Sequence, residues 1–467
     1  MRRSRGEGCD GAGDVSKPTP ISGFPEWLPA ERIVEQQVLD ILREVFELHG
    51  FASVQTRAVE PLEQLLRKGE TSKEVYTLRR LQADAAEDSG DQASALGLHF
   101  DLTVPFARYV LENAGHLQFP FRRYQIQPAW RGERPQEGRY REFVQADVDI
   151  VDRDTLSVHH EVEIAQVMAD VFGRLPLPPV RMQVNNRRLI EGYYRGLGIV
   201  EVEAVMRVVD KLDKIGRAGV EKAMVDDLGA STEQARGALA LAEITGDHAT
   251  IAEQVAALGV THPLLDEGLA VLVSVLEGTA ALRSDTFTVV ADLAIARGLD
   301  YYTGTVFETR MQGFEHVGSI CSGGRYDSLA TDGRTTYPGV GISLGVTRTL
   351  APLFSRGLLT ASRSTPTAVL VALPSEEERA ACTAVASALR RRGIATEVSP
   401  TASKYGKQIR YAERRGIPFV WFPQPDGSHQ VRDIRSAEQA AADPASWAPP
   451  DADLRPATTR TAAAAAD

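Results

Sequence analysis

The stretch Arg131-Gly-Glu-Arg-Pro-Gln-Glu-Gly-Arg-Tyr-Arg141 is flanked on both sides by runs in which polar and apolar residues alternate. The polar members of these runs are Arg123, Gln125, Gln127, Arg131, Arg141, Gln145, Asp147 and Asp149, with Phe143 among them. Successive side chains of a strand point to opposite faces, so two alternating runs around a short connection predict an antiparallel hairpin. One face of this hairpin is mostly apolar, and the other carries Arg, Gln and Asp.

The polar face of the hairpin has two interpretations. A solvent-exposed face is common in antiparallel sheets, but such a face is usually rich in Lys, Glu and Thr. Here one ring, Phe143, stands among Arg, Gln and Asp instead. This composition favours the floor of a binding site, where the ring stacks a base and the polar groups hold a charged small molecule.

The composition excludes several classes of protein. The chain has 467 residues, 43% of them hydrophobic, which predicts two to three domains with sizeable cores. The net charge of −11 argues against a broad basic surface for nucleic acid but is compatible with a local one. Cys9, Cys321 and Cys382 lack the spacing of a zinc site or a disulfide framework, so we expect reduced thiols. Without an apolar run of membrane length or a signal-peptide core, we expect a cytoplasmic protein with no membrane association.

Composition and periodicity also divide the chain into segments. Residues 1–18 and 441–467 lack apolar periodicity, and we expect both tails to be disordered. Residues 19–350 form the domain that contains the hairpin. A Ser/Arg/Thr/Pro-rich linker at 351–366 follows, and residues 367–440 have the pattern βαβαββ, which predicts a small α/β domain.

Within the larger domain, helical spacing predicts a helix at about 30–49, and a strand is expected at 51–56. A mostly helical insertion is expected at about 187–285. Between these segments, Thr103 precedes Val104-Pro105, so we expect it to cap a helix, with Asp101 beside the helix start. A cap with a nearby acid is an ordinary structural device, and alone it indicates no site.

Glycine-containing stretches follow the insertion. Arg297-Gly-Leu-Asp-Tyr-Tyr302 leads into a strand at 305–310, and Gly323-Gly-Arg-Tyr-Asp327 predicts a turn where backbone approaches a ligand. Glycines 339, 341 and 345 leave one face of a strand without side chains, which would accommodate a flat ring. That strand ends in a helix that carries Arg348 near its start.

A row of cations marks the second helix of the small domain. Lys404, Lys407, Arg410 and Arg414 are spaced three, three and four residues apart, so they share one helical face. Such a row is usually a solvated surface. In a separate domain of an acidic chain, it favours contact with an RNA backbone.

Together these motifs resemble the histidyl-tRNA synthetases, a family of class II aminoacyl-tRNA synthetases, from about Pro20 to Gln439. The resemblance rests on the Arg131-x-Glu133 hairpin, on the glycine strand that leads to Arg348, and on Arg297-Gly-Leu-Asp-Tyr-Tyr302, which is peculiar to the histidine branch. It implies an α+β fold: a class II antiparallel sheet flanked by helices, a mostly helical insertion, and a C-terminal α/β anticodon-binding domain.

The resemblance also implies roles for individual residues. Arg131 and Arg297 lie on the α-phosphate and the histidine carboxylate and are the catalytic residues. The ATP-binding residues it implies are Arg131, Glu133, Arg139, Phe143 and Arg348, of which Phe143 and Arg348 sandwich adenine. The histidine-binding residues it implies are Asp101, Thr103 and Gln145 on the α-amino group, Asp149 and Tyr302 on the imidazole, Tyr326 closing that pocket, and Tyr301 and Arg297. The anticodon-binding domain carries the tRNA-binding residues Lys404, Lys407, Arg410 and Arg414.

The activity implied is that of a histidine–tRNA ligase. Histidine and ATP form histidyl-adenylate and pyrophosphate, and histidine then passes to the 3′ end of tRNA(His). Mg²⁺ is expected on the ATP phosphates, although no acidic cluster locates its ligands. A homodimer is expected, because the resemblance implies that the helix at 30–49 and the strand after it form the dimer interface. Val38, Ile41, Leu42 and Val45 also make this helix more apolar than one core contact requires.

Two rival functions are opposed by particular residues. Synthetase-like regulatory subunits of histidine biosynthesis typically lack an anticodon domain, whereas this chain has a candidate at 367–440. A class II ligase for another amino acid is opposed by the run from Arg297 to Tyr302.

The chain departs from the family pattern at three positions. Pro128 has no N–H for a ladder bond, so it must face an edge or a bulge, and this puts the hairpin's strength in doubt. Thr347 stands where many relatives carry Glu, and Asp101 where many bacterial relatives carry Glu.

Overall fold

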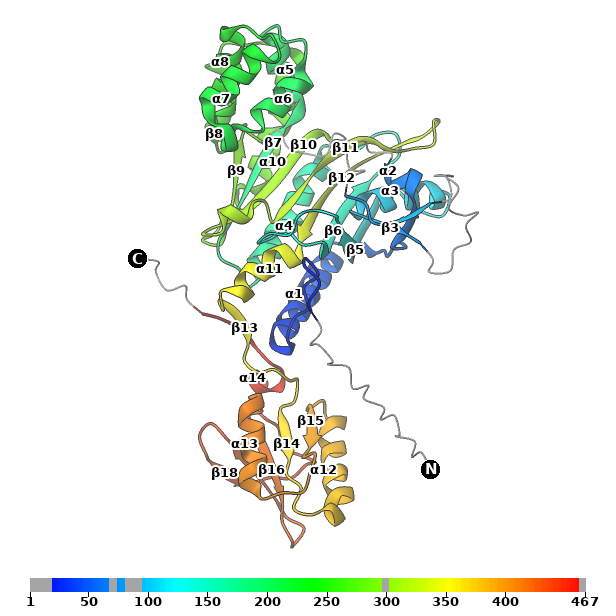
Figure 1. The fold of residues 1–467 in the computed structure, drawn as a ribbon, viewed down its shortest axis with the longest axis vertical. Coiled ribbons are helices and arrows are strands. Elements are labelled where there is room, and N and C mark those ends of the chain that lie inside the picture. Colours follow the sequence, from blue (N-terminus) through cyan, green and yellow to red (C-terminus); the bar gives the residue numbers. More distant parts are fainter. Residues whose placement is uncertain (1–18, 67–73, 80–94, 296–301, 462–467) are drawn as a thin grey trace, which may run out of the picture.

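The computed structural model describes residues 19–66, 74–79, 95–295 and 302–461. In this part of the chain, a large sheet with covering helices occupies the centre of Figure 1, a helical unit stands at one end, and a small α/β domain lies at the other. The 1–18 tail, Arg297, Tyr301 and residues 462–467 lie outside the described residues.

The central sheet is mostly antiparallel, as expected. In spatial order its described strands are β1 (Ala52–Ser53), β5 (Phe121–Trp130), β6 (Glu142–Val151), β12 (Thr336–Gly345), β11 (Cys321–Thr331), β10 (Tyr302–Met311), β7 (Val180–Asn186), β9 (Phe287–Asp292) and β8 (Thr245–Gly246). Only the pairs β1–β5 and β7–β9 are parallel among them. The strand expected at 51–56 is shorter than predicted, because its ladder with β5 extends over two residues at the sheet edge.

The predicted hairpin is β5 and β6. Arg123 pairs with Asp149, Gln125 with Asp147 and Gln127 with Gln145, so the whole polar set faces one side. These six side chains are all buried, which excludes the solvent-exposed interpretation. The opposite, apolar face carries Tyr124, Val148 and Ile150 into the main core.

Three helices cover the apolar face of the hairpin and its neighbours. They are α1 (Pro29–Leu48), α4 (His159–Arg174) and α11 (Val346–Ser355). Val38, Leu42 and Val45 of α1 are buried within this chain, so its apolar excess is used in the core. The burial of these three residues is thus explained within one chain and does not by itself indicate a partner subunit.

The start of α3 (Thr103–Asn113) differs from the prediction. The backbone N–H of Val104 donates to Asp101 Oδ1 at 3.0 Å, whereas no cap bond comes from Thr103, which already lies inside the helix. Asp101 is therefore the capping side chain, because only a residue outside the first turn can reach back to an unpaired N–H. The cap holds this carboxylate in a buried position.

The predicted turn at Gly323–Asp327 is instead the interior of β11, which pairs with β10 and β12 on its two sides. A Cβ on Gly323 would lie 2.1 Å from the carbonyl oxygen of Gly341. Glycine is needed here because neighbouring strands approach closely, not because the backbone turns toward a ligand.

A small three-stranded sheet lies beside the hairpin. It consists of β2 (Val59–Pro61), β4 (Leu96–Leu98) and β3 (Thr77–Leu78), with the short helix α2 (Leu62–Leu66) following β2.

The insertion is mostly helical, as predicted. Its helices are α5 (Arg187–Gly196), α6 (Val202–Val209), α7 (Leu212–Asp226), α8 (Thr232–Ala242), α9 (Ile251–Ala256) and α10 (Pro263–Ala280). In Figure 1 this unit stands at the β7, β9 and β8 end of the sheet.

The small domain has the predicted βαβαββ order. Its elements are β14 (Val369–Val371), α12 (Arg379–Arg391), β15 (Thr396–Val398), α13 (Tyr405–Arg415), β16 (Phe419–Pro423) and β17 (His429–Asp433), with β18 (Gln439–Ala441) added at the sheet edge.

The expected disordered tail is wrong for residues 441–461. Trp447 packs on Phe419 and Trp421, with ring centroids 5.3 and 5.5 Å apart. After the short helix α14 (Asp451–Leu454), β19 (Thr458–Arg460) pairs with β13 (Leu359–Ala361). The packing of Trp447 on the core and the pairing of β19 with β13 give this segment a defined structure, although its composition alone suggests disorder.

The expected linker at 351–366 is also partly regular, because α11 continues to Ser355 and β13 follows it. The C-terminal segment therefore returns from the small domain to the large one. There Gln37 of α1 donates to the carbonyl oxygen of Pro456 at 2.6 Å. Among the described helices, none combines the length and the apolarity needed to cross a bilayer.

Candidate active site

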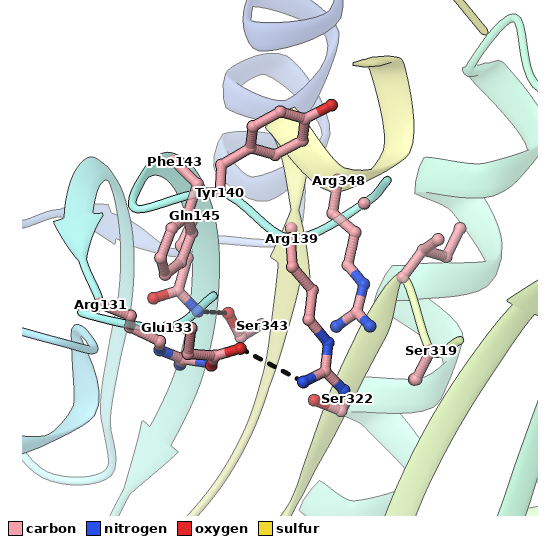
Figure 2. Close-up of a pocket in the computed structure, with 13 residues that line it drawn as sticks. Arg131, Glu133, Arg139, Tyr140, Phe143, Gln145, Ser319, Ser322, Ser343 and Arg348 are labelled. Atoms are coloured by element: carbon pink, nitrogen blue, oxygen red, sulfur yellow. Dashed lines mark hydrogen bonds and ion pairs between the residues drawn. The ribbon is translucent and has the colours of Figure 1, made fainter. Parts of the chain in front are cut away.

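A cavity of about 190 Å³ opens on the polar face of the hairpin (Figure 2). Its walls come from the hairpin, from β11 and β12, and from the start of α11. The predicted residues that line it are Arg131, Glu133, Arg139, Phe143, Gln145 and Arg348. The structure therefore brings the predicted ATP-binding residues to one place.

Guanidinium groups dominate the charge of this cavity. Arg131 Nε donates to the Phe100 carbonyl oxygen at 3.0 Å, and its Cζ lies 5.1 Å from the centroid of the Phe143 ring. Glu133 lies 3.2 Å from Arg139 Nη1 and 3.9 Å from Arg131 Nη1. Three arginines with one carboxylate in the cavity suit a polyanion such as a triphosphate.

Arg348 is anchored at the first turn of α11. Its Nη2 donates to the Val317 carbonyl oxygen at 2.7 Å. Burial, and then the charges of Arg139 and Arg131, lower the pKa of Arg348 to about 10, so it remains charged at neutral pH. An anion between these guanidinium groups would relieve their repulsion.

The departures at Pro128 and Thr347 have structural explanations. The Val144 N–H donates to Thr347 Oγ1 at 2.8 Å, so it points away from β5. Pro128, opposite Val144, therefore sits at a non-hydrogen-bonded pair, where its missing N–H removes no bond to β6. On the other side of β5, β1 reaches only Tyr124, so no strand pairs with Pro128 there, and His99 Nε2 lies 2.7 Å from the Pro128 carbonyl oxygen.

A second polar cluster lies farther along the same face. Tyr326 OH donates to Asp149 Oδ1 at 2.9 Å, and Tyr302 pairs with Tyr326 across β10 and β11. Of the room predicted on β12 for a flat ring, the part at Gly339 and Gly341 is occupied by the protein itself, whereas Gly345 lines the cavity. A Cβ on Gly341 would lie 1.9 Å from Asp149 Oδ1, and one on Gly339 would lie 2.5 Å from the Tyr326 ring.

Gln145 lies between the cavity and this cluster. Its Nε2 donates to Ser343 Oγ at 2.7 Å. Its Oε1 is buried and has no hydrogen-bond partner within the described residues. The amide therefore presents an acceptor toward the space between the two groups of predicted residues.

Two charged residues of the polar face went unassigned in the sequence. Arg123 Nη2 lies 2.7 Å from Asp149 Oδ2 and 3.8 Å from Asp147 Oδ2. Burial raises the pKa of Asp147 to about 7; Arg123 lowers it and Asp149 raises it. Arg123 and Asp147 lie on the same alternating polar face as Asp149, and this pattern was the sequence signal that could have assigned them to the site.

Other lining residues carried little or no signal. Tyr140 lies within the Arg131–Arg141 stretch, but no pattern there indicated a role for it. Ser319 and Ser322 lie in segments without a motif, whereas Ser343 shares the glycine face of β12. Glu74 is close enough to Glu133 that burial and the Glu133 charge together raise its pKa.

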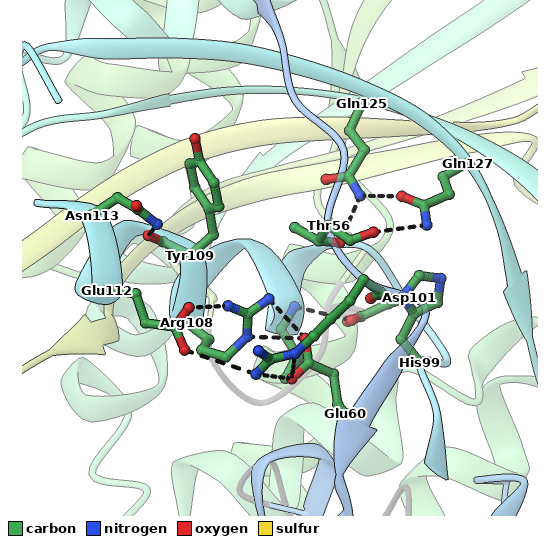
Figure 3. Close-up of polar contacts among 12 residues, drawn as sticks. Thr56, Glu60, His99, Asp101, Arg108, Tyr109, Glu112, Asn113, Gln125 and Gln127 are labelled. Carbon is green, nitrogen blue, oxygen red and sulfur yellow. Dashed lines mark hydrogen bonds and ion pairs between the residues drawn. The ribbon is translucent and has the colours of Figure 1, made fainter. Parts of the chain in front are cut away.

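A polar network supports the position of α3 (Figure 3). Arg108 of α3 pairs with the buried Glu60 at 2.8 Å, and Arg57 reaches the same carboxylate at 3.1 Å. Gln125 and Gln127 both bond to Thr56. These contacts fix the segment that carries Asp101 against the polar face.

The remaining predicted residues lie elsewhere or cannot be placed. Arg297 and Tyr301 lie outside the described residues. The four cations of the small domain are exposed on or beside α13, and Lys407, Arg410 and Arg414 line a shallow groove with Glu413. In the part of the chain that the structure describes, no group of three or more His, Cys, Asp or Glu residues could hold a metal ion.

Comparison with known proteins agrees with this geometry. A family model described as histidyl-tRNA synthetase matches residues 23–349, and one described as an anticodon binding domain matches residues 368–440. Histidine–tRNA ligase from Cutibacterium acnes is 57% identical over 94% of this chain and 98% of its own length. The corresponding protein of Micrococcus luteus is 55% identical over 96% and 99%.

A solved structure of histidyl-tRNA synthetase from Nostoc sp. PCC 7120 superimposes with a TM-score of 0.80 at 33% identity. The match covers 91% of this chain and 96% of that one.

Proposed function

The chain belongs to the histidyl-tRNA synthetase family, and from this premise we propose how its residues divide the work of the reaction. It is an ATP-dependent histidine–tRNA ligase: it joins histidine to ATP as histidyl-adenylate, releases pyrophosphate, and transfers histidine to the 3′ end of tRNA(His). The observation that carries the assignment of roles is the continuous polar face on which the arginine cavity adjoins the Asp149–Tyr326 cluster.

ATP occupies the arginine cavity in this proposal. Adenine stacks between Phe143 and Arg348, while Arg131 and Arg139 meet the phosphates. The supporting observations are the cavity lining and the lowered pKa of Arg348, which results first from burial and then from the charges of Arg139 and Arg131. Glu133 belongs to the same signature and holds the arginines at fixed spacing.

Histidine binds beside ATP, with its side chain at Asp149, Tyr302 and Tyr326 and its α-amino group at Asp101, Thr103 and Gln145. The unpartnered Gln145 Oε1 supports this placement, because an ammonium group supplies the donor that this buried acceptor lacks. The Asp101 carboxylate lies close enough to raise the pKa of Asp147. Tyr301 is assigned to the same pocket by resemblance alone.

The first step requires a carboxylate oxygen of histidine to attack the α-phosphorus as pyrophosphate leaves. Both reactants are anionic, so fixed guanidinium groups must offset the charge that grows at phosphorus. We assign this role to Arg131 and, by resemblance, to Arg297. No covalent nucleophile from the protein is required, because orientation and electrostatics supply the rate.

Mg²⁺ is proposed to arrive on ATP. Protein sites for this ion often supply only one or two carboxylates beside substrate phosphates. Glu133 and Glu74 fit that pattern, since they face each other closely enough to interact. They are the candidate protein ligands, and the ion would neutralise phosphate charge.

We assign tRNA binding to the small domain, with Lys404, Lys407, Arg410 and Arg414 on the RNA backbone. Their exposure on one helix and the groove beside them support this assignment. The presence of this domain and of Arg131 and Arg348 also opposes a purely regulatory role.

A homodimer in the cytoplasm completes the proposal. Leu78 and Leu96 pair directly across β3 and β4 and are 42% and 44% exposed, so they form an apolar patch on one face of the small sheet. Leu28 and Ile21 are also exposed. The buried free thiols of Cys321 and Cys382 suit a reducing compartment.

An ATP–pyrophosphate exchange assay over the twenty amino acids tests the function. Histidine alone should support exchange, and the product should then charge tRNA(His). Exchange with another amino acid at comparable efficiency would refute the assigned specificity.

A further inference from the structure

Arg123 lies beneath the cluster that is assigned to the histidine side chain. Its side chain is 0% exposed, and arginine remains protonated in proteins, so a full positive charge is buried at this point. Its Cζ lies 4.2 Å from the centroid of the Phe106 ring, and its Nη1 donates to Gln125 Oε1 at 3.3 Å. A buried cation of this kind requires a compensating anion.

Asp149 is that anion. Arg123 and Asp149 are direct partners across β5 and β6, and Nη2 and Oδ2 are 2.7 Å apart. The N–H direction does not satisfy hydrogen-bond geometry, so the attraction is mainly between charges. Tyr326 holds the other oxygen, and Gly341 leaves the space in which the carboxylate sits. Asp149 is thus held from three sides.

Around this pair, one guanidinium lies among three carboxyl groups. The titratable groups that interact with Asp147, Asp149 or Tyr326 come from several elements: Arg123 from β5, Asp147 and Asp149 from β6, Tyr302 from β10, Cys321 and Tyr326 from β11, and Asp101 from the start of α3. Burial raises the pKa of Tyr326 and of the Cys321 thiol, so both groups are neutral at neutral pH. Arg123 therefore cancels one carboxylate directly where the imidazole is assigned.

We propose that Arg123 is a positioning residue that restricts the pocket to the neutral form of the histidine side chain. The inference rests on the proposed assignment of Asp149 to the imidazole. A carboxylate has about four acceptor positions, so Asp149 can accept an imidazole N–H while it is held by Arg123 and Tyr326. An imidazolium, or the cationic side chain of lysine or arginine, would meet a guanidinium in a buried setting and be repelled.

The test compares Arg123→Met with Arg123→Lys by pyrophosphate exchange on the full-length protein. The wild-type KM for histidine should rise about tenfold for each pH unit below the imidazole pKa, because only the neutral fraction binds. Arg123→Met should raise this KM on the order of 10- to 100-fold at pH 8 and flatten or reverse its pH dependence, with the KM for ATP little changed. Arg123→Lys should keep the wild-type pH dependence, because it keeps the charge.

The matched control is Arg122→Met on the opposite face of β5, where Arg122 pairs with Glu163. It should leave the KM for histidine and its pH dependence unchanged. Because Asp147 also titrates near neutral pH, both profiles are repeated in an Asp147→Asn background, where the difference that Arg123→Met causes should persist. Identical pH profiles for wild type and Arg123→Met would overturn the proposal, as would parallel rises of KM for histidine and ATP.

Two further measurements separate the possible failures. An unchanged KM for histidine in Asp149→Ala would reject the proposed pocket itself. If Asp149→Ala raises this KM but Arg123→Met leaves the KM and its pH dependence unchanged, only the role of Arg123 is rejected. The second measurement needs no variant: the ¹⁵N spectrum of labelled histidine bound to the wild-type protein near pH 6 should show a neutral tautomer. Bound imidazolium would overturn the inference.

Discussion

Replacement of Asp147 by Asn should change how the stability of the fold depends on pH. Asp147 lies on β6 between Gln145 and Asp149, is 2% exposed, and has its pKa raised to about 7, mainly by burial. Arg123 and a hydrogen bond with Ser343 offset part of this cost. Asparagine keeps the shape and removes the titration.

The magnitude follows from the pKa of Asp147 in the two states. The folded value is about 7 and the ordinary value is 3.8, so the folded state binds the proton more tightly. Stability from this group is fully present below the ordinary value and is lost as the pH rises through the folded one. At about 1.4 kcal/mol per pH unit the whole loss is about 4 kcal/mol, of which about 3 kcal/mol falls between pH 5 and pH 8.

Chemical unfolding of the full-length protein at pH 5, 6, 7 and 8 checks this expectation, with a probe in the large domain. The free energy of unfolding of Asp147→Asn relative to wild type should improve steadily across this range. An Asp40→Asn variant, at an exposed position of α1, serves as the control and should give a profile parallel to wild type. If the free energy of unfolding of Asp147→Asn also runs parallel to that of wild type from pH 5 to pH 8, Asp147 is ionised throughout and the reasoning from burial fails.

Three further outcomes are expected. Arg297→Ala should slow adenylate formation by about 10²- to 10³-fold while transfer from preformed adenylate is less affected, and a first step at the wild-type rate in rapid quench would show that Arg297 is not catalytic. Lys407→Glu should reduce the slope of log affinity for tRNA against log salt by about one or more, whereas Glu438→Lys on the same domain serves as a control that should not reduce it. Leu78→Asp combined with Leu96→Asp should shift a sedimenting dimer toward monomer, and an unchanged dimer would place the interface elsewhere.

The hairpin and the arrangement of the glycine strand were predictable because strand periodicity is a local property. Alternation assigns each residue of β5 and β6 to a face, and the burial of Arg123 to Asp149 on one face follows once the sheet is covered on both sides. The helical insertion and the βαβαββ domain were predictable for the same reason.

The errors arose where long-range contacts decide the structure. The cap of α3 depends on which oxygen reaches the Val104 N–H, which the spacing of Thr103 does not reveal. The apolar residues of α1 have the same pattern whether they face their own core or a partner. In the site, the glycine face of β12 predicted open space along its length, but Tyr326 and Asp149 fill it at Gly339 and Gly341, and it stays open only beside Gly345.

The return of the C-terminal segment to the large domain has a consequence for how the protein matures during synthesis. The hydrogen bond between Gln37 and Pro456 joins residues 419 positions apart. Strand β13 likewise pairs with β19, which is synthesised about 100 residues later, and so has no partner until β19 has been made. Domains generally fold from the N-terminus as the ribosome releases them, so both cores can form before this closure exists. The registration of the tRNA-binding domain against the domain that performs the chemistry is then completed only after the last residues emerge. A released chain that ends shortly before Pro456 would carry two folded domains without this connection.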